Sequence, residues 1–140
     1  MNTRTIAALV AAFTFAGSAL NTNAASCTTT RPDVKLQNVT VTQLNKTQAY
    51  VAVKIMNIGQ AQPKLGPSIG PQSVYLYQGS RWLGGTDIPS LAAGGMYRAD
   101  FIVPLPIGPA PYTAFYVPEP DSAALLDCDS SNNSLSSSLW

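Results

Sequence analysis

Apolar residues recur at every second position over several stretches of this chain. Between residues 47 and 57, one set of alternate positions is entirely apolar: Ala49, Val51, Val53 and Ile55. The same period of two runs through residues 73–78, 96–103 and 111–118. Such alternation predicts β-strands with one buried face. The many β-branched and aromatic residues in these runs favour the same structure.

Turn-forming residues divide the chain into short segments. Eleven Pro and ten Gly are spread along it, and Gly79-Ser80 has the form of a hairpin turn. No stretch combines the periodicity and the capping residues of a helix. We therefore predict an all-β, immunoglobulin-like antiparallel β-sandwich of about seven strands, near residues 33–42, 47–57, 73–78, 81–87, 96–103, 111–118 and 134–139.

The first predicted strand contains one irregularity. Val34 and Leu36 share one parity, whereas Val39 and Val41 have the other. In a regular strand, half of these side chains would face solvent. We predict a β-bulge near Gln37-Asn38, where one extra residue restores the inward direction.

The first 24 residues have the layout of a secretory signal peptide. A short basic segment, Met1–Arg4, precedes the apolar run Ile6–Leu20, and small residues lead up to Ala24. This apolar run is shorter than the ~20 residues that a transmembrane helix requires. We expect cleavage after Ala24, no membrane span, and a single domain over residues 25–140.

Cys27 and Cys128 are the only cysteines. A signal peptide directs them to an oxidising compartment, so we predict that they form a disulfide in a secreted or periplasmic protein. Lipidation of Cys27 is the alternative, because Ala24-Ala25-Ser26-Cys27 partly resembles a lipobox. A lipid anchor would leave Cys128 as an unpaired thiol, which is unusual in such a compartment, and we therefore favour the disulfide.

Charge and composition argue against several function classes. Removing residues 1–24 takes only Arg4 from the eight bases, which leaves seven bases against seven acids. A nucleic-acid-binding surface needs a basic excess, so we predict none. The chain has no His and no phosphate-binding loop. Carboxylate pairs involving Asp87 or Asp100 are conceivable, but strand charges usually face water. We predict no enzyme activity, no catalytic residue and no cofactor.

The C-terminal quarter is locally acidic, which raises the question of a calcium site. Calcium takes ~6–8 oxygen ligands, and the candidates here are Glu119, Asp121, Asp127, Asp129, Asn132 and Asn133. Their spacing lacks the Asp-x-Asp-x-Asp-Gly pattern of an EF-hand loop, whereas Asp, Ser and Asn are typical of turns. We predict a structural turn at residues 129–133 whose amide side chains bond the backbone, and no metal site.

Several aromatic residues are predicted on outward strand positions: Tyr50, Tyr75, Tyr77, Trp82 and Phe115. Exposed aromatic rings can stack on sugars or anchor a protein partner. For each ring, the alternative is that it covers an edge of the sandwich. We select Tyr75, Tyr77 and Trp82 as candidate ligand-binding residues.

The segment Gly59–Gln72 is a long loop rich in Pro and Gly. Loops of this length are often functional, and its prolines limit the entropy that binding would cost. Leu65 and Ile69 are apolar residues that a purely solvated loop does not need. We predict that they join the ligand-binding surface, and the alternative is that they fold back over an open end of the core.

Three short motifs lie in the chain after the leader. They are Pro32-Asp33-Val34, Ile88-Pro89-Ser90-Leu91-Ala92-Ala93-Gly94-Gly95 and Leu126-Asp127-Cys128-Asp129-Ser130-Ser131-Asn132-Asn133-Ser134. Together they resemble the CARDB family, the cell-adhesion-related immunoglobulin-like module of bacterial envelope proteins, although Ser130 stands where the family usually has Glu. Tyr112 opens a predicted strand, at the position of the corner tyrosine of such sandwiches.

What the resemblance implies about function is less specific, because one fold hosts many functions. We expect a non-catalytic binding or adhesion module of the bacterial envelope, whose partner is another protein or an envelope glycan. The alternatives are a structural component of a surface assembly, or a secreted enzyme inhibitor or accessory protein. The sequence predicts no particular oligomeric state.

Overall fold

The computed structural model describes residues 27–139, and the predicted signal peptide therefore lies outside the described residues. Seven strands follow one another along the chain: β1 (Val34–Gln43), β2 (Gln48–Asn57), β3 (Gln72–Gln78), β4 (Arg81–Ile88), β5 (Met96–Pro104), β6 (Tyr112–Pro118) and β7 (Ser134–Ser137). Three short helical turns separate the last two strands: η1 (Pro120–Ser122), α2 (Ala123–Leu126) and η2 (Ser130–Asn132).

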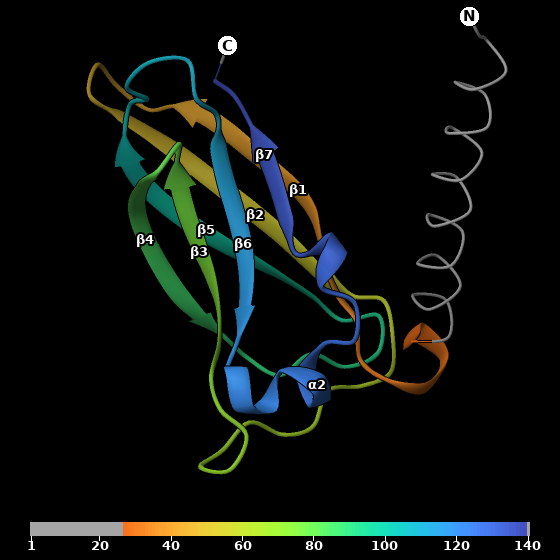
Figure 1. The fold of residues 1–140 in the computed structure, drawn as a ribbon. Helices are drawn as coiled ribbons and strands as arrows, with labels where there is room; N and C mark the ends of the chain where they lie inside the picture. Colours follow the sequence, from red (N-terminus) through yellow and green to blue (C-terminus); the bar gives the residue numbers. More distant parts are fainter. Residues whose placement is uncertain (1–26, 140) are drawn as a thin grey trace, which may run out of the picture.

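The strands form two antiparallel sheets that pack against one another (Figure 1). One sheet has the strand order β1-β2-β5, and the other has the order β4-β3-β6-β7. Each strand alternates between inward and outward side chains, so each sheet has one apolar face to bury. The predicted all-β, immunoglobulin-like sandwich of seven strands is confirmed.

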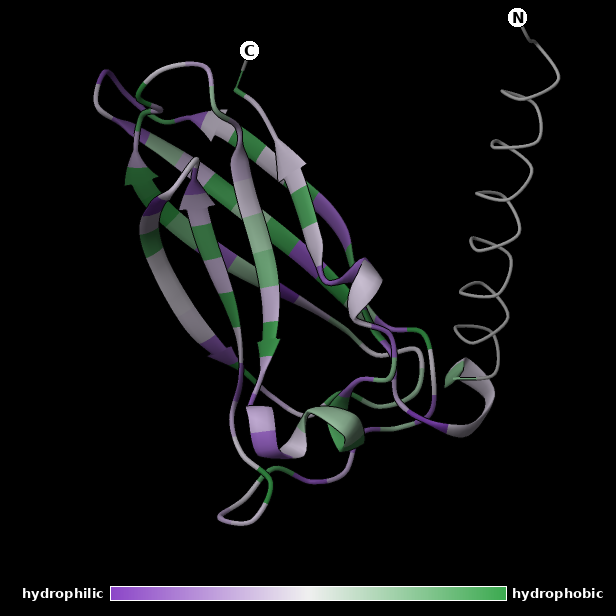
Figure 2. Cartoon of the chain, viewed as in Figure 1, coloured by the Kyte–Doolittle hydropathy of each residue, from purple (hydrophilic) through white to green (hydrophobic). Residues whose placement is uncertain are grey.

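The core lies between the two sheets and consists of the predicted inward positions. Val51, Val53 and Ile55 of β2 are completely buried, and so are Val74 and Leu76 of β3. Figure 2 shows the alternation of hydrophobic and hydrophilic residues along the strands. Full burial of such a side chain stabilises the fold by about 1.5–3 kcal/mol, so the two-residue period carries much of the folding energy.

The predicted irregularity of the first strand is also confirmed. The pairing of β1 with β2 shifts by one residue between Leu36 and Asn38. This bulge leaves both Leu36 and Val39 buried, at 3% and 5% exposure, although they differ in parity. One inserted residue thus keeps the apolar side chains on the core side.

Tyr112 occupies the corner between β5 and β6. Its ring is fully buried, and its hydroxyl donates a hydrogen bond of 2.8 Å to the carbonyl of Pro104, the last residue of β5. This geometry matches the corner tyrosine expected from the sequence.

Two details differ from the sequence-based expectation. Residues Ala123–Leu126 form a single α-helical turn that was not predicted, because four residues are too few to show a helical period. The last strand ends at Ser137 rather than at residue 139. Both differences lie in the polar C-terminal quarter, where the apolar pattern is weakest.

Candidate functional site

The outer face of the four-stranded sheet carries a cluster of aromatic side chains from three strands. In the register of the sheet, Tyr77 of β3 lies opposite Trp82 of β4. Two residues earlier on β3, Tyr75 lies opposite Phe115 of β6. Cross-strand neighbours on one face of a sheet are close enough for aromatic contact. The candidates Tyr75, Tyr77 and Trp82 are therefore brought together, and Phe115 joins them; we call these four residues the aromatic face.

A bulge in β4 turns its tryptophan outward. The pairing of β3 with β4 shifts between Leu76 and Tyr77, so Leu83 is the extra residue. Leu83 packs against the core, whereas Trp82 stays 58% exposed. Large apolar side chains exposed on a sheet face are typical of interaction surfaces.

Glycine at position 85 makes room for the tyrosine beside it. A Cβ atom on Gly85 would lie 2.7 Å from the ring of Tyr75, closer than real contacts allow. The Tyr75 ring therefore packs directly on the backbone of β4. The neighbouring rings of Tyr77 and Phe115 meet edge to face, with centroids 5.6 Å apart, an arrangement that aromatic pairs favour.

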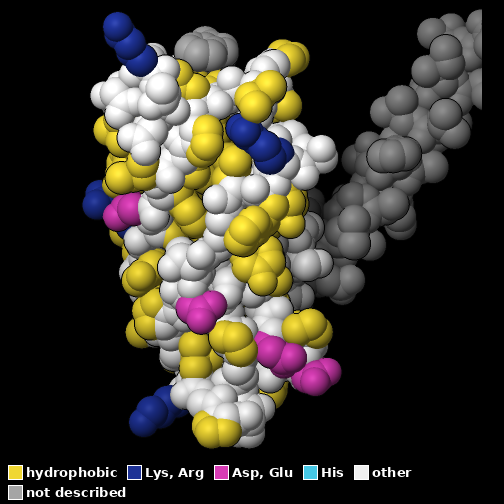
Figure 3. Space-filling view, turned by 90° about the vertical axis from the view of Figure 1, so that its left-hand side faces the viewer, with side chains coloured by type: hydrophobic (Ala, Val, Ile, Leu, Met, Phe, Trp, Pro, Cys, Tyr) yellow, Lys and Arg dark blue, Asp and Glu magenta, His cyan; other side chains and the backbone are white. Residues whose placement is uncertain are grey.

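A groove of about 770 Å³ runs along this sheet face. It begins at the β3–β4 turn, lined by Gly79 and Ser80, and it reaches Pro118 and Asp127 near the helical turns. Figure 3 views the molecule from the side of β4 and shows hydrophobic side chains spread over this side, with charged side chains between them. The groove thus runs along β6 and the second half of β3.

The structure separates the loop candidates from the aromatic candidates. Gly66 and Ile69 pair through two backbone hydrogen bonds of 2.8 and 3.2 Å, which closes a tight turn in the long loop. Leu65 and Ile69 are half-buried and are not members of the core cluster. The loop leads into the start of β3, whereas Trp82 lies beside the end of β3 (Figure 1). The five predicted binding residues therefore do not form one continuous site.

A second cluster joins the two ends of the domain. Asp33, which precedes β1, and Asp127, which follows α2, are both buried, and their carboxyl groups lie within hydrogen-bonding reach of each other. Asn132 donates to Asp33 over 3.1 Å, and Asn133 donates to Asp127 over 2.6 Å. We call these four residues the end clasp. The first and third motifs of the sequence thus meet in space.

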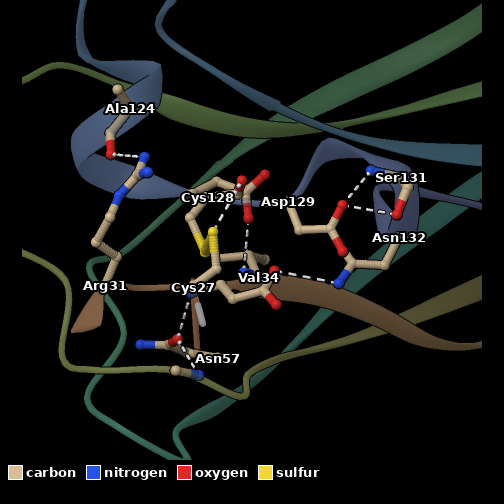
Figure 4. Close-up of a disulfide and its surroundings, with 12 residues drawn as sticks. Cys27, Arg31, Val34, Asn57, Ala124, Cys128, Asp129, Ser131 and Asn132 are labelled. Atoms are coloured by element: carbon tan, nitrogen blue, oxygen red, sulfur yellow. Dashed lines mark hydrogen bonds between the residues drawn. A yellow bond between two sulfur atoms is a disulfide. The ribbon is translucent and has the colours of Figure 1, made fainter. Parts of the chain in front are cut away.

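The disulfide lies beside the end clasp (Figure 4). Cys27 and Cys128 are joined, with their Cα atoms 5.7 Å apart, as predicted. The amide of Cys128 also donates to the carbonyl of Pro32 over 3.0 Å, and the guanidinium of Arg31 donates to the carbonyl of Ala124. Covalent and hydrogen bonds therefore hold the segment before β1 against the segment before β7.

Burial changes the acidity of Asp127 in the end clasp. Loss of water raises the pKa of Asp127 to about 7, although hydrogen bonds from Asn133 and from the amide of Val34 favour its charged form. The nearby carboxyl of Asp33 raises this pKa further. Burial and the nearby carboxyl group both disfavour the charged form of Asp127, so around neutral pH Asp127 is partly protonated.

The predicted turn is present, but one detail of the prediction was wrong. The carboxylate of Asp129 accepts a hydrogen bond of 3.0 Å from the amide of Ser131, as a turn residue does. The side chains of Asn132 and Asn133, however, donate to carboxylates and not to backbone groups. Asp33, the partner of Asn132, is 99 positions away in the chain, so local turn chemistry could not indicate it.

The two asparagines give a stability prediction. We expect Asn132→Ala to lower the free energy of unfolding by roughly 0.5–2 kcal/mol, because the buried carboxylate of Asp33 loses the hydrogen bond that Asn132 donates. Urea denaturation measures the change, and Ser131→Ala, in the same turn but more exposed, serves as the matched control.

Melting curves recorded with Ca²⁺ and with a chelator should coincide. A midpoint that rises steeply with Ca²⁺ would contradict the structural interpretation of this turn.

Sequence reasoning missed a buried polar network at the same end of the sandwich. Gln62 and Gln72 bond each other through their amides at 2.8 Å, and the hydroxyl of Tyr116 donates to Gln72. Asn57 is completely buried and donates to the carbonyls of Gln60, Leu91 and Ala92. Parity was the signal in the sequence: Gln72 shares that of the inward residues Val74 and Leu76, and Asn57 shares that of the inward residue Ile55.

The conceivable carboxylate pairs from the sequence are not formed. Asp87 accepts a hydrogen bond of 2.6 Å from Ser73 on the four-stranded sheet. Asp100 pairs with Arg98 at 3.0 Å on the three-stranded sheet. Within residues 27–139, no three side chains of His, Cys, Asp or Glu gather as a metal site would require. Over the same range, no helix is long and apolar enough to cross a membrane.

Comparison with known proteins agrees with the motif resemblance at the level of the fold. A CARDB domain from Pyrococcus furiosus, whose crystal structure is described as a complex with di-metal ions, superposes with a TM-score of 0.53 and 16% sequence identity. The match covers 76% of this chain and 89% of the other. No family model matches the sequence, and the search of curated proteins found no similar protein.

Proposed function

We propose that this protein is a secreted or periplasmic binding module of the bacterial envelope, without catalytic activity, that takes its ligand on the aromatic face. The observation that carries the proposal is the gathering of Tyr75, Tyr77, Trp82 and Phe115 on the outside of one sheet. Trp82 and Phe115 are 58% and 38% exposed. Aromatic side chains at such positions dominate binding energies when a ligand covers them.

Two features of the chain support a role without catalysis. It contains no His, the commonest general base. Its only contact between two buried carboxyl groups in the described part of the chain, Asp33 with Asp127, lies inside the end clasp and is bonded by asparagine amides. These groups hold two chain segments together, which is a structural task.

Our proposal does not include metal ions like those of the Pyrococcus furiosus domain. A two-metal centre needs several carboxylate or imidazole ligands around each ion. In residues 27–139 no three such groups gather, and Asp127 already accepts hydrogen bonds from Val34 and Asn133. The residues present do not fit a di-metal site, and the proposed binding involves none.

A paired substitution on the aromatic face tests the proposed function. We expect Tyr77→Ala with Trp82→Ala to abolish the capture of ligands from an envelope extract by the immobilised protein, because both rings are lost from one row of the sheet. The matched control is Tyr50→Ala, since Tyr50 lies outward on the opposite sheet, bonded to Asp100. Equal capture by the paired variant and the wild type would refute the assignment of this face.

The loop residues require a separate test. Leu65 and Ile69 lie outside the core cluster, and our proposal gives them a second ligand contact apart from the aromatic face. We therefore expect the double substitution to Ser to change the melting temperature little and to weaken binding. Thermal unfolding and a binding assay, run on the same preparation, measure the two effects. A large loss of stability would show instead that the two side chains cover the end of the core.

A further inference from the structure

The aromatic face continues into a row of hydroxyl groups in the adjoining strands. Across the sheet, Trp82 and Tyr77 are followed by Thr113 on β6 and Ser136 on β7. The two hydroxyls of Thr113 and Ser136 lie 2.7 Å apart. In the strand order β4-β3-β6-β7, this first row is therefore aromatic on one side of the sheet and hydroxylated on the other.

The next row repeats this order. Gly85 and Tyr75 are followed by Phe115 on β6 and Ser134 on β7. Because a sheet places such residues side by side on one face, the two rows together form a surface with aromatic rings over β4, β3 and β6 and hydroxyl groups over β6 and β7. The exposed hydroxyls of Ser80 and Ser130 also line the groove.

Neither row contains a charged side chain. The single charged residue lining the groove is Asp127, which is buried and partly protonated around neutral pH. An anionic ligand needs Lys or Arg partners, and a cationic ligand needs exposed carboxylates. The groove offers neither, so the matching ligand is uncharged.

The hydroxyl row favours a polyhydroxylated ligand over an apolar protein surface. A covered Ser or Thr hydroxyl needs a hydrogen-bond partner, and leaving it without one costs free energy. A sugar ring supplies hydroxyl groups at its rim, and its C–H face can lie on an aromatic ring. One flat ligand thereby satisfies both halves of the surface, with few polar contacts fixing its orientation.

Resting on the proposed function, we propose that the ligand of the aromatic face and the adjoining groove is a neutral polysaccharide, bound with its sugar faces on Trp82, Tyr77 and Tyr75 and its hydroxyls toward the serines of β7. The groove runs from Gly79 and Ser80 past Tyr75 and Tyr77 to Pro118 at the end of β6, so it accommodates several consecutive sugar units. Because no ion pair contributes, binding is insensitive to salt.

Affinity electrophoresis tests this directly. Native gels contain barley mixed-linkage β-glucan, galactomannan or soluble starch, and polygalacturonate serves as the anionic counterpart. We expect at least one neutral polysaccharide to retard the protein, equally at low and high salt, and polygalacturonate to have no effect. Tyr77→Ala with Trp82→Ala should weaken the retardation at least ~10-fold, and Tyr50→Ala should leave it unchanged.

A third variant tests whether the position of an aromatic ring matters for binding, and not only its presence. Gly85→Ala keeps every aromatic side chain but displaces the Tyr75 ring, so we expect a partial loss of retardation with an unchanged circular dichroism spectrum. No retardation by any neutral polysaccharide, or retardation by polygalacturonate alone, overturns the inference. If the paired variant then still loses capture of a protein from envelope extract, the proposed function survives and the glycan assignment fails. If capture is also unaffected, both fail.

Discussion

Replacing both cysteines by serine is expected to destabilise the protein more than any single substitution on its surface. The bond between Cys27 and Cys128 closes a loop with a sequence separation of 101 residues. Chain entropy places the stabilisation of such a loop at up to ~4.7 kcal/mol, reduced by residual structure in the unfolded chain. Urea denaturation of the wild type and of the double variant measures the difference.

Two controls accompany this measurement. A reductant should lower the stability of the wild type toward that of the double variant, and it should leave the double variant unchanged. The intact mass of the wild-type protein should correspond to two oxidised cysteines. Two free thiols in the folded protein, or a lipid on Cys27, would contradict the predicted bond.

The second large effect is a loss of stability as the pH rises from about 4 to about 7. Burial raises the pKa of Asp127 from 3.8 to about 7, so the folded state binds a proton that the unfolded state releases at lower pH. The stability that this proton contributes is fully present below the unfolded pKa and disappears as the pH passes the folded pKa. Each pKa unit corresponds to about 1.4 kcal/mol, so the fall is on the order of a few kcal/mol.

Asp127→Asn tests the origin of this pH dependence. Asparagine imitates the protonated carboxyl, and it can still accept from the amide of Val34. We expect the variant to lose most of the decline between pH 4 and pH 7 and to be more stable than the wild type above pH 7. Asp121→Asn, at an exposed carboxyl in η1, should retain the wild-type curve. An unchanged slope in Asp127→Asn would show that another group causes the decline.

Local patterns in the sequence were sufficient for the strands and their faces. The alternation over residues 47–57 identifies a buried side for β2, because successive side chains of a strand point to opposite faces. The parity change after Leu36 indicates the bulge for the same reason. The outward direction of Tyr75 and Tyr77 follows from the inward direction of Val74 and Leu76. Each inference needs only neighbouring residues.

Which residues make up the candidate site could be known only from the register of the sheet. The sequence pointed to Trp82 and Tyr77, but only the pairing of β3 with β4 shows that they are opposite each other. The hydroxyls of β7 join the same surface because β7 pairs with β6. Leu65 and Ile69 precede β3 by a few residues, yet the extended strand carries Tyr77 away from them.

The sequence by itself determined the fold class, the strand faces, the bulge and the pairing of the two cysteines, because each depends on local periodicity or on residue count. Only the tertiary structure decided that Asp33 contacts Asp127 and that Asn132 bonds a carboxylate instead of its own turn. These contacts join residues almost a hundred positions apart. Their energies depend on burial and on distance in space, and neither quantity is encoded in the spacing of residues along the chain.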